Sequence, residues 1–237
     1  MPVEFKDNLV IKTFDSDIET KRICDLYNSF SHHVQARTQG NQLIYKYVKG
    51  ETLGTILNET QRVREVMKNL GVILRSIHFE DYQITPSYDA VCKSRNLFPD
   101  FSKFITSNQY MSRIHGDLNT QNIIISKDNQ ITFIDRMSDR GDIMFDFTFI
   151  MSILCRYLIT KEIDYKLMIT DFFSEYSKGI RDKKDFFTSF RNNFMGYGYF
   201  VYNDDLHRKD FTEWSEGEKI AQGLSEVDTF LNYLDII

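Results

Sequence analysis

Short runs of apolar residues occupy the first fifty positions of the chain, and turn-forming residues separate them. Two pairs of these runs predict two β-hairpins, because extended runs joined by Asp, Asn or Gly can close through a tight turn. The pairs are Val3–Phe5 with Leu9–Ile11, around Lys6–Asn8, and Val34–Thr38 with Gln42–Val48, around Gln39–Asn41. The N-terminal part is therefore expected to be a small antiparallel sheet.

Apolar positions recur every three to four residues in several later segments, which predicts helices. The first is Asp15–Phe30, with capping residues at its start and apolar Ile18, Ile23, Leu26 and Phe30. Thr60–Phe79 is strongly amphipathic and ends in His78, which is expected to pack and cap rather than react. Four further helices are predicted at Asp146–Ile159, Asp164–Ser177, Lys184–Tyr202 and Glu216–Leu234, with a short one at Phe98–Thr106. The aromatic residues of the late helices are expected to form core.

Between these helices lies a segment of polar residues at the ends of buried strands. The apolar runs Ile123–Ser126 and Gln130–Ile134 flank a turn at Lys127–Asn129 and predict a third hairpin. Asp117 and Asn122 precede this hairpin, and Asp135 follows it. A polar turn alone would explain Asp117 and Asn122, but one carboxylate, an amide five residues later and a second carboxylate also form the catalytic arrangement of phosphoryl-transfer enzymes.

The local motifs strengthen that interpretation. The loop reads His115-Gly116-Asp117, Arg136-Met137 follows the second Asp, and Gly141–Phe147 reads Gly-Asp-Ile-Met-Phe-Asp-Phe. These segments together resemble the kinase-like superfamily, and within it the branch of aminoglycoside phosphotransferases and choline kinases. Protein kinases usually have His-Arg-Asp and Asp-Phe-Gly at the corresponding places.

The resemblance implies roles for the polar residues. Asp117 would accept the proton of the acceptor hydroxyl, and Asn122 and Asp135 would bind Mg²⁺ through oxygen atoms. His115 would brace the loop. Asp146 would accept backbone hydrogen bonds from the catalytic loop, and the role of Asp142 stays open.

The resemblance also implies a nucleotide site in the N-terminal part. Lys12 would contact the nucleotide phosphates, although an exposed edge lysine fits the same pattern. Glu19 would be the helix carboxylate that faces Lys12, with Asp25 as a competitor. Backbone groups of Lys46, Tyr47 and Val48 would form the hinge that binds the base of ATP or GTP, although a plain connection between strand and helix predicts the same residues.

One departure from the family concerns the phosphates of the nucleotide. The family has two strands joined by a glycine-rich or equivalent loop ahead of the lysine, whereas the eleven residues before Lys12 contain no glycine. The phosphate-covering loop is therefore expected to be absent or much reduced.

Acceptor-binding residues are sought in the late helices and their loops, where the family lines its acceptor pocket. The candidates are Asp204, Asp205, Glu213 and Trp214, although a solvated loop explains each of them singly.

Composition limits the remaining classes. A net charge of −5 does not favour nucleic acid as a partner, and the most apolar window contains Asp146 and Arg156, which argues against a membrane span. The three cysteines have no metal-binding or disulfide spacing and suggest the reducing cytoplasm. His32 and His33 have no nearby third ligand and are expected to be solvated.

The expected fold is therefore α+β and two-lobed, like that of protein kinases. A reduced sheet lobe that binds the nucleotide occupies residues 1–48, and a mostly helical lobe with the catalytic and acceptor sites occupies residues 49–237. The expected function is ATP-dependent phosphorylation of a hydroxyl on a sugar, aminoglycoside or amino alcohol. The alternatives are a compact atypical protein kinase and a nucleotide-binding pseudokinase with a protein partner. The sequence does not indicate an oligomeric state.

Overall fold

The computed structural model describes residues 1–85, 108–147, 150, 165–190 and 192–193. The predicted helix at Phe98–Thr106, most of Asp146–Ile159, the end of Lys184–Tyr202 and all of Glu216–Leu234 lie outside these residues, as do the acceptor candidates Asp204, Asp205, Glu213 and Trp214. Within the described part of the chain, no helix is long and apolar enough to cross a membrane.

The N-terminal residues form one antiparallel sheet whose strand order is β1-β2-β4-β3. Its strands are β1 (Val3–Lys6), β2 (Leu9–Thr13), β3 (Ala36–Gln39) and β4 (Gln42–Lys46). The β1–β2 turn consists of Asp7 and Asn8, whose φ angles are 50° and 63°. Two consecutive positive φ angles match the right-handed twist of a hairpin, and Asp and Asn tolerate them better than most residues do. Both predicted N-terminal hairpins are confirmed.

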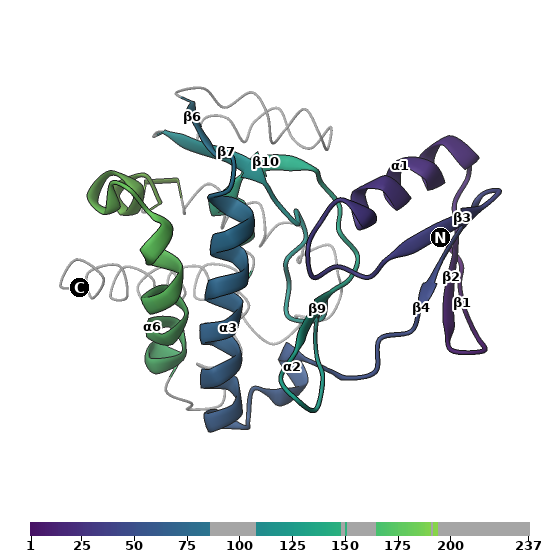
Figure 1. Cartoon of the computed structure of the whole chain (residues 1–237), viewed down its shortest axis with the longest axis horizontal. Coiled ribbons are helices and arrows are strands. Elements are labelled where there is room, and N and C mark those ends of the chain that lie inside the picture. The colour runs from purple at the N-terminus through teal and green to yellow at the C-terminus, as the bar shows by residue number, and fades with distance from the viewer. Residues whose placement is uncertain (86–107, 148–149, 151–164, 191, 194–237) are drawn as a thin grey trace, which may run out of the picture.

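Helix α1 (Asp17–Asn28) connects β2 with β3 and lies along this sheet (Figure 1). The hydroxyl of Ser16 caps its start by accepting the Glu19 N–H at 3.2 Å. The helix and the sheet bury a small apolar cluster made of Val10, Ile23, Cys24, Leu26, Tyr27, Val34, Leu43 and Tyr45. Ile18, expected on the apolar face, is instead 84% exposed. It lies in the first turn of the helix, outside this cluster.

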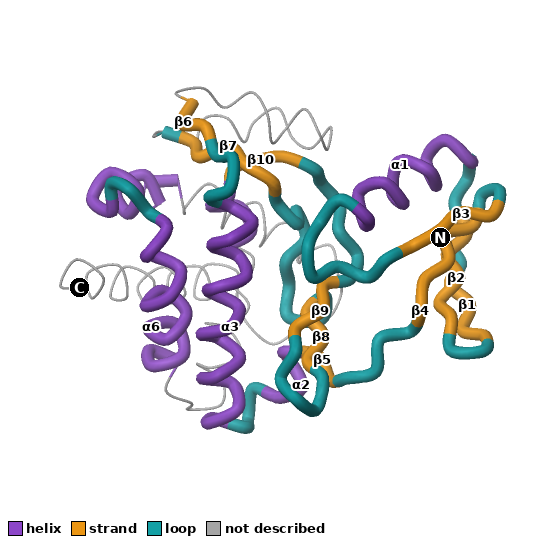
Figure 2. The backbone as a smooth tube through the Cα atoms, viewed as in Figure 1, coloured by secondary structure: helices purple, strands orange, loops and turns teal. Residues whose placement is uncertain are grey.

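The remaining described residues form helices and two further antiparallel sheets, with strand orders β5-β8-β9 and β10-β7-β6 (Figure 2). The strands are β5 (Glu51–Thr52), β6 (Gln83–Thr85), β7 (Gln109–Arg113), β8 (Ile123–Ile125), β9 (Ile131–Phe133) and β10 (Arg140–Asp142). The helices are α2 (Leu53–Ile56), α3 (Thr60–His78), α6 (Tyr165–Tyr176) and the short 3₁₀ helix η2 (Ser177–Gly179). The predicted β8–β9 hairpin is confirmed.

Helices α3 and α6 lie side by side and enclose the larger apolar core (Figure 1). The predicted stripe of α3 is buried at Val63, Val66, Met67, Leu70, Leu74 and Ile77, and Ile73 packs partly against it. His78 is fully buried, and its Nδ1 lies 2.9 Å from the hydroxyl of Tyr176. The predicted packing role of His78 is therefore confirmed.

The connection from α1 to β3 joins the two parts of the molecule through the edge of β9. Phe133 donates its N–H to His32 O at 2.7 Å and accepts the Val34 N–H at 3.1 Å. The side chain of His33 points inward and is 5% exposed, so the expectation of a solvated residue was wrong for His33. His32 is exposed, as predicted. Because alternate residues of an extended segment face opposite sides, strand-like pairing with β9 directs one histidine inward.

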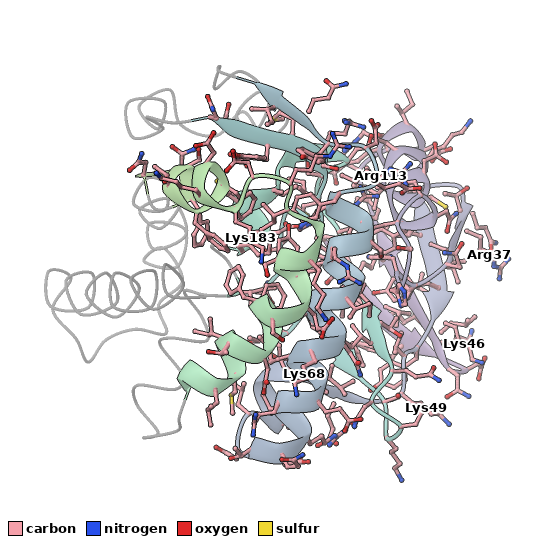
Figure 3. The ribbon with its side chains drawn as sticks, turned by 60° about the vertical axis from the view of Figure 1, so that its left-hand side comes forward. Arg37, Lys46, Lys49, Lys68, Arg113 and Lys183 are labelled. Carbon is pink, nitrogen blue, oxygen red and sulfur yellow. The ribbon has the colours of Figure 1, made fainter. Side chains whose placement is uncertain are left out.

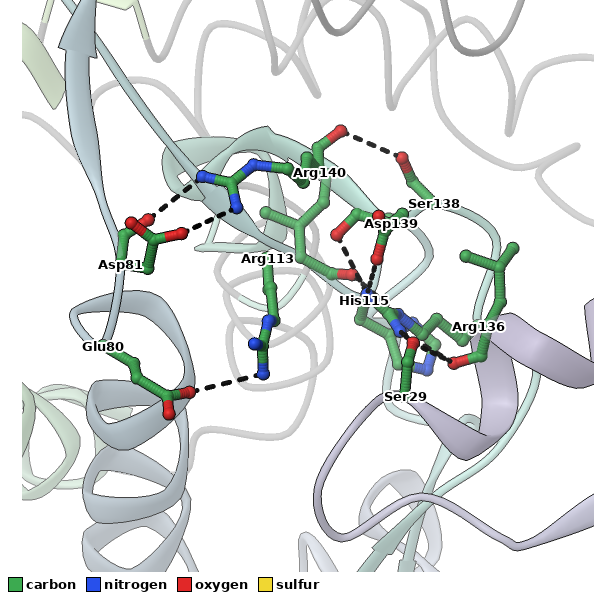
Figure 4. Close-up of polar contacts among 12 residues, drawn as sticks. Ser29, Glu80, Asp81, Arg113, His115, Arg136, Ser138, Asp139 and Arg140 are labelled. Atoms are coloured by element: carbon green, nitrogen blue, oxygen red, sulfur yellow. Dashed lines mark hydrogen bonds and ion pairs between the residues drawn. The ribbon is translucent and has the colours of Figure 1, made fainter.

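The junction is held by the guanidinium of Arg136, whose side chain is 0% exposed. Its Nε donates to Ile114 O at 3.0 Å, and Nη1 donates to Leu26 O at 2.7 Å and to Ser29 Oγ at 2.8 Å. Nη2 donates to Asp139 O at 2.9 Å and to its carboxylate at 3.3 Å. Figure 4 shows this guanidinium between Ser29 and Asp139. One side chain therefore joins the end of α1, the end of β7 and the loop before β10.

We expect Arg136→Met to lower the free energy of unfolding by about 2–5 kcal/mol, because the buried carbonyls of Ile114 and Leu26 each lose a hydrogen bond to a charged donor, worth about 1.5–3 kcal/mol. Urea denaturation measures the change. The control is Arg113→Met. The side chain of Arg113 is 43% exposed (Figure 3) and pairs with exposed Glu80 (Figure 4), so this substitution should cost about 1 kcal/mol or less. Equal losses in the two variants would contradict the role given to Arg136.

Candidate active site

The loop that carries Asp117 is shaped by a buried carboxylate. Asp146 accepts the N–H of His115 at 2.7 Å and the N–H of Gly116 at 2.8 Å. Burial by itself raises the pKa of Asp146, but hydrogen bonding and charge from His78, together with the loop contacts, lower it overall. Gly116 has a φ of 79°, and a Cβ there would lie 2.7 Å from that of Ser138. The predicted structural role of Asp146 is confirmed.

Two amides hold the Asp117 carboxylate. Nδ2 of Asn122 donates to Asp117 Oδ2 at 3.0 Å and to its backbone oxygen at 2.9 Å, and Nδ2 of Asn119 lies 3.3 Å from Asp117 Oδ1. Asn122 immediately precedes β8, so a short buried strand anchors it. The structure thus brings Asp117 and Asn122 together, as the sequence predicted, and adds Asn119, which the sequence analysis had not selected.

Asp135 follows β9 and has a φ of 61°, a left-handed conformation that residues other than Gly adopt rarely, although Asp and Asn adopt it more often than most. Its Oδ1 forms an ion pair with the ammonium of Lys12 and accepts the hydroxyl of Tyr27 at 2.9 Å. Lys12 is 5% exposed and its Nζ lies 5.7 Å from the centre of the Tyr45 ring, so it is not an exposed edge lysine. One carboxylate oxygen of Asp135 therefore connects the segment after β9 with both strand β2 and helix α1.

The helix carboxylate expected to face Lys12 does not reach it. Glu19 is exposed in the first turn of α1, Asp25 is exposed as well, and the ion pair of Lys12 is with Asp135. The side chain of α1 that reaches this group is Tyr27, two turns after Glu19. The helical period predicted that Tyr27 belongs to a helix, but it gives no information on a partner that is 108 residues away.

The residues proposed as a hinge begin with the last residue of β4, Lys46. The side chain of Lys46 is exposed and projects away from the ribbon in Figure 3. The N–H of Tyr47 donates to Asn8 O at 2.8 Å, so this group is used inside the sheet. Val48 packs partly against the small cluster, and its backbone forms no hydrogen bond within the described part of the chain. Within the described residues, the backbone of Val48 and the carbonyl of Tyr47 therefore have no hydrogen-bond partner.

The donor set fits a hard divalent cation. Asn122 must point its Nδ2 toward Asp117, because both partner atoms there are acceptors, and this leaves Oδ1 without a partner among the described residues. Oδ2 of Asp135 likewise has no hydrogen bond or ion pair there. No cluster of three or more His, Cys, Asp or Glu side chains is found in the described ranges. Mg²⁺ commonly uses one or two protein oxygens together with substrate phosphates, so these two atoms suffice.

Two neutral imidazoles brace this region. His115 Nε2 donates to Ile134 O at 2.8 Å, and its Nδ1 accepts the N–H of Asp117 at 3.3 Å. His33 Nδ1 donates to Val34 O at 3.0 Å, and its Nε2 accepts the N–H of Arg136 at 3.3 Å. Burial lowers the pKa of His115 to about 4 and that of His33 to about 3. Both rings therefore stay uncharged beside the loop, and the predicted bracing role of His115 agrees with these contacts.

Solved structures with the same fold are small-molecule kinases. A choline kinase from Streptococcus pneumoniae aligns with 98% of this chain and 89% of its own, at 14% identity and a TM-score of 0.50. An aminoglycoside-3'-phosphotransferase of type VIII aligns with 80% of this chain and 84% of its own, at 15% identity and a TM-score of 0.54. A glucosamine kinase solved with glucosamine, ADP and inorganic phosphate aligns with 96% of this chain and 77% of its own, at 11% identity and a TM-score of 0.55.

No family model and no curated protein matches the sequence. The structural likeness nevertheless shows the fold, which is a two-lobed kinase-like fold with a reduced N-terminal sheet, shared with these solved structures. The resemblance inferred from the sequence motifs is thereby confirmed for the fold. Among the described residues a single strand, β1, precedes the lysine-bearing strand β2, and the turn between these two strands consists of Asp7 and Asn8.

We expect the free energy of unfolding to fall as the pH is lowered from about 6.5 toward 4. In the unfolded chain both imidazoles bind a proton near pH 6.5, whereas His33 and His115 stay neutral in the native state down to about 3 and 4. The unfolded state therefore binds more protons across this interval, and the loss should be on the order of 2–3 kcal/mol for each of the two imidazoles. Urea denaturation at pH 7, 5.5 and 4.5 measures it.

His33→Gln should make this pH dependence shallower, because the amide oxygen can still accept the Arg136 N–H but does not titrate. His32→Gln is the control, since His32 is exposed, and it should leave the slope unchanged. The same slope in both variants and in the wild type would contradict the account.

Proposed function

We propose that this protein transfers the γ-phosphoryl group of ATP to a hydroxyl of a small molecule, with Mg²⁺ as cofactor. The observation that carries the proposal is an amide-held Asp117 carboxylate together with two oxygens that have no partner among the described residues, Asn122 Oδ1 and Asp135 Oδ2, in a fold shared with small-molecule kinases. The solved neighbours named above act on choline, aminoglycosides and glucosamine, which supports a hydroxyl-bearing small molecule as the acceptor.

In this mechanism Asp117 accepts the proton of the acceptor hydroxyl as its oxygen attacks the γ-phosphorus and the bond to ADP breaks. The Asn122 and Asn119 amides keep the carboxylate in one orientation, which reduces the entropy lost in reaching the transition state. Asn122 and Asp135 would hold Mg²⁺, which when bound supplies positive charge to the phosphates. Lys12 is the cation on the sheet side, and its buried ammonium is positioned by Asp135 before any nucleotide binds.

The division of the chain follows from the same assignment. Residues 1–48 would form the nucleotide-binding lobe, with the base near the free backbone groups of Val48, and residues 49–237 would carry the catalytic and acceptor sites. A backbone hinge does not choose between adenine and guanine by side-chain chemistry. ATP and GTP are therefore both to be tested.

A transfer assay tests the proposal directly. The protein is incubated with Mg²⁺ and γ-labelled ATP or GTP, beside sugars, aminoglycosides, amino alcohols including choline, and a generic protein substrate. Label on a small molecule supports the proposal, and label on the protein substrate alone would favour a compact protein kinase. Nucleotide binding without transfer to any acceptor would favour a pseudokinase and overturn the proposal.

Measurements of nucleotide affinity and turnover should distinguish the roles of Asp117 and Asp135. Asp117→Asn keeps the side-chain shape but removes the proton acceptor, so nucleotide affinity should survive while turnover falls by roughly 10²–10⁴-fold. Asp135→Asn removes a charge that would face the cation, so it should weaken Mg²⁺-dependent nucleotide binding as well as turnover. Nucleotide titration and transfer rates are measured on both variants. Loss of nucleotide binding in Asp117→Asn, with full binding in Asp135→Asn, would show that the roles are reversed.

Lys12→Ala should weaken ATP much more than adenosine, because only ATP presents phosphate charge to the ammonium. Isothermal titration with each ligand measures the difference. Lys49→Ala is the control, since Lys49 is exposed on the surface (Figure 3), and both affinities should stay near those of the wild type. If Lys12→Ala weakens ATP and adenosine equally, Lys12 only supports the sheet.

A further inference from the structure

Two neighbouring residues of α1 interlock with two neighbouring residues after β9. The backbone oxygen of Leu26 accepts Arg136 Nη1 at 2.7 Å, and the hydroxyl of Tyr27, the next residue, donates to Asp135 Oδ1 at 2.9 Å. The side chain of Arg136 reaches the helix, and the side chain of Tyr27 reaches the segment after β9. The helix can therefore neither slide nor rotate without breaking a bond to Asp135 or Arg136.

The Tyr27 hydroxyl is a lasting donor at this place. Tyr27 is 2% exposed, and its ring packs edge-on against His33 at 4.2 Å between centroids. A phenol keeps its proton at neutral pH, because its ordinary pKa is about 10, and this O–H lies 2.9 Å from Asp135 Oδ1. A carboxylate on the helix could not donate to Asp135 and would repel it, whereas a phenol binds it without adding charge.

The contacts of the Asp135 carboxylate are asymmetric. Lys12 and Tyr27 both bind Oδ1, while Oδ2 has no protein partner in the described part of the chain. Two donors on one oxygen fix the rotation of the carboxylate and direct the other oxygen to a ligand. Hydrogen bonds of this kind orient metal-binding carboxylates in proteins, and their loss typically lowers metal affinity by about 10–100-fold.

We infer that Tyr27 is a positioning residue for the proposed metal ligand Asp135. Its hydroxyl holds Oδ1 so that Oδ2 faces the divalent ion of a nucleotide complex. The inference rests on the proposed function and adds that metal binding depends on the position of α1, because Tyr27 belongs to that helix. Tyr27 takes the place that the sequence analysis gave to Glu19, but it acts on the aspartate as a neutral donor rather than on the lysine as an anion.

The test measures Mn²⁺ binding to the full chain in the presence of AMP-PNP, with free Mn²⁺ followed by electron paramagnetic resonance. Tyr27→Phe removes one oxygen atom and keeps the ring. Tyr45→Phe is the matched control, because Tyr45 is also buried, its ring lies 5.8 Å from that of Tyr27, and its hydroxyl forms no hydrogen bond among the described residues. Adenosine binding by isothermal titration reports the base site without phosphate or metal.

Tyr27→Phe should weaken Mn²⁺ binding by about 10–100-fold and leave adenosine affinity unchanged. Tyr45→Phe should leave both unchanged. Unchanged Mn²⁺ binding in Tyr27→Phe, a parallel loss of adenosine, or an equal loss in Tyr45→Phe would overturn the inference. Tighter Mn²⁺ binding in Tyr27→Phe would also overturn it, because the hydroxyl would then compete with the ion. A wild-type protein that binds AMP-PNP but no Mn²⁺ would instead refute the metal site of the proposed function, and with it the inference.

Discussion

The buried guanidinium of Arg136 is the interaction on which the geometry of the candidate site depends. A cation inside a protein is costly unless its donors are satisfied, and this one uses every N–H direction on three separate segments. Burial lowers the pKa of Arg136 to about 10, which still leaves it charged at neutral pH. Because a planar guanidinium has fixed donor directions, its partners must adopt one arrangement.

The catalytic loop lies between two buried charges of opposite sign. Arg136 donates to the carbonyl of Ile114, and Asp146 accepts the N–H groups of the next two residues, His115 and Gly116. The backbone thus presents its acceptor to the cation and its donors to the anion. Asp117 is the next residue, so these contacts fix the backbone from which its side chain extends. Its amide contacts then hold the carboxylate in one orientation. Neither buried charge is placed to react, yet together they determine where the proposed base points.

Asp135 shows the opposite situation, because its backbone is strained. A left-handed conformation at a residue other than Gly costs on the order of 1–3 kcal/mol and persists only where surrounding contacts determine it. Here Lys12 and Tyr27 hold its side chain, and the next residue, Arg136, is anchored to Leu26 by its own side chain. The strained residue is therefore the one that would bind the cation. The contacts that maintain its conformation come from strand β2 of the N-terminal sheet and from helix α1.

The sequence by itself determined the local elements and the chemistry of the loop. Asp7-Asn8 and Gly40 specify their turns through positive φ angles, the stripe of α3 predicts its buried face, and the spacing of Asp117, Asn122 and Asp135 predicts the candidate site. These signals are readable because turn chemistry and periodicity act over a few residues. Tertiary structure alone decided which helix residue meets Asp135, that Arg136 is buried, and that His33 points inward. Each of these depends on a partner about a hundred positions away, and no local pattern selects among the polar residues that a folded chain can bring to one place.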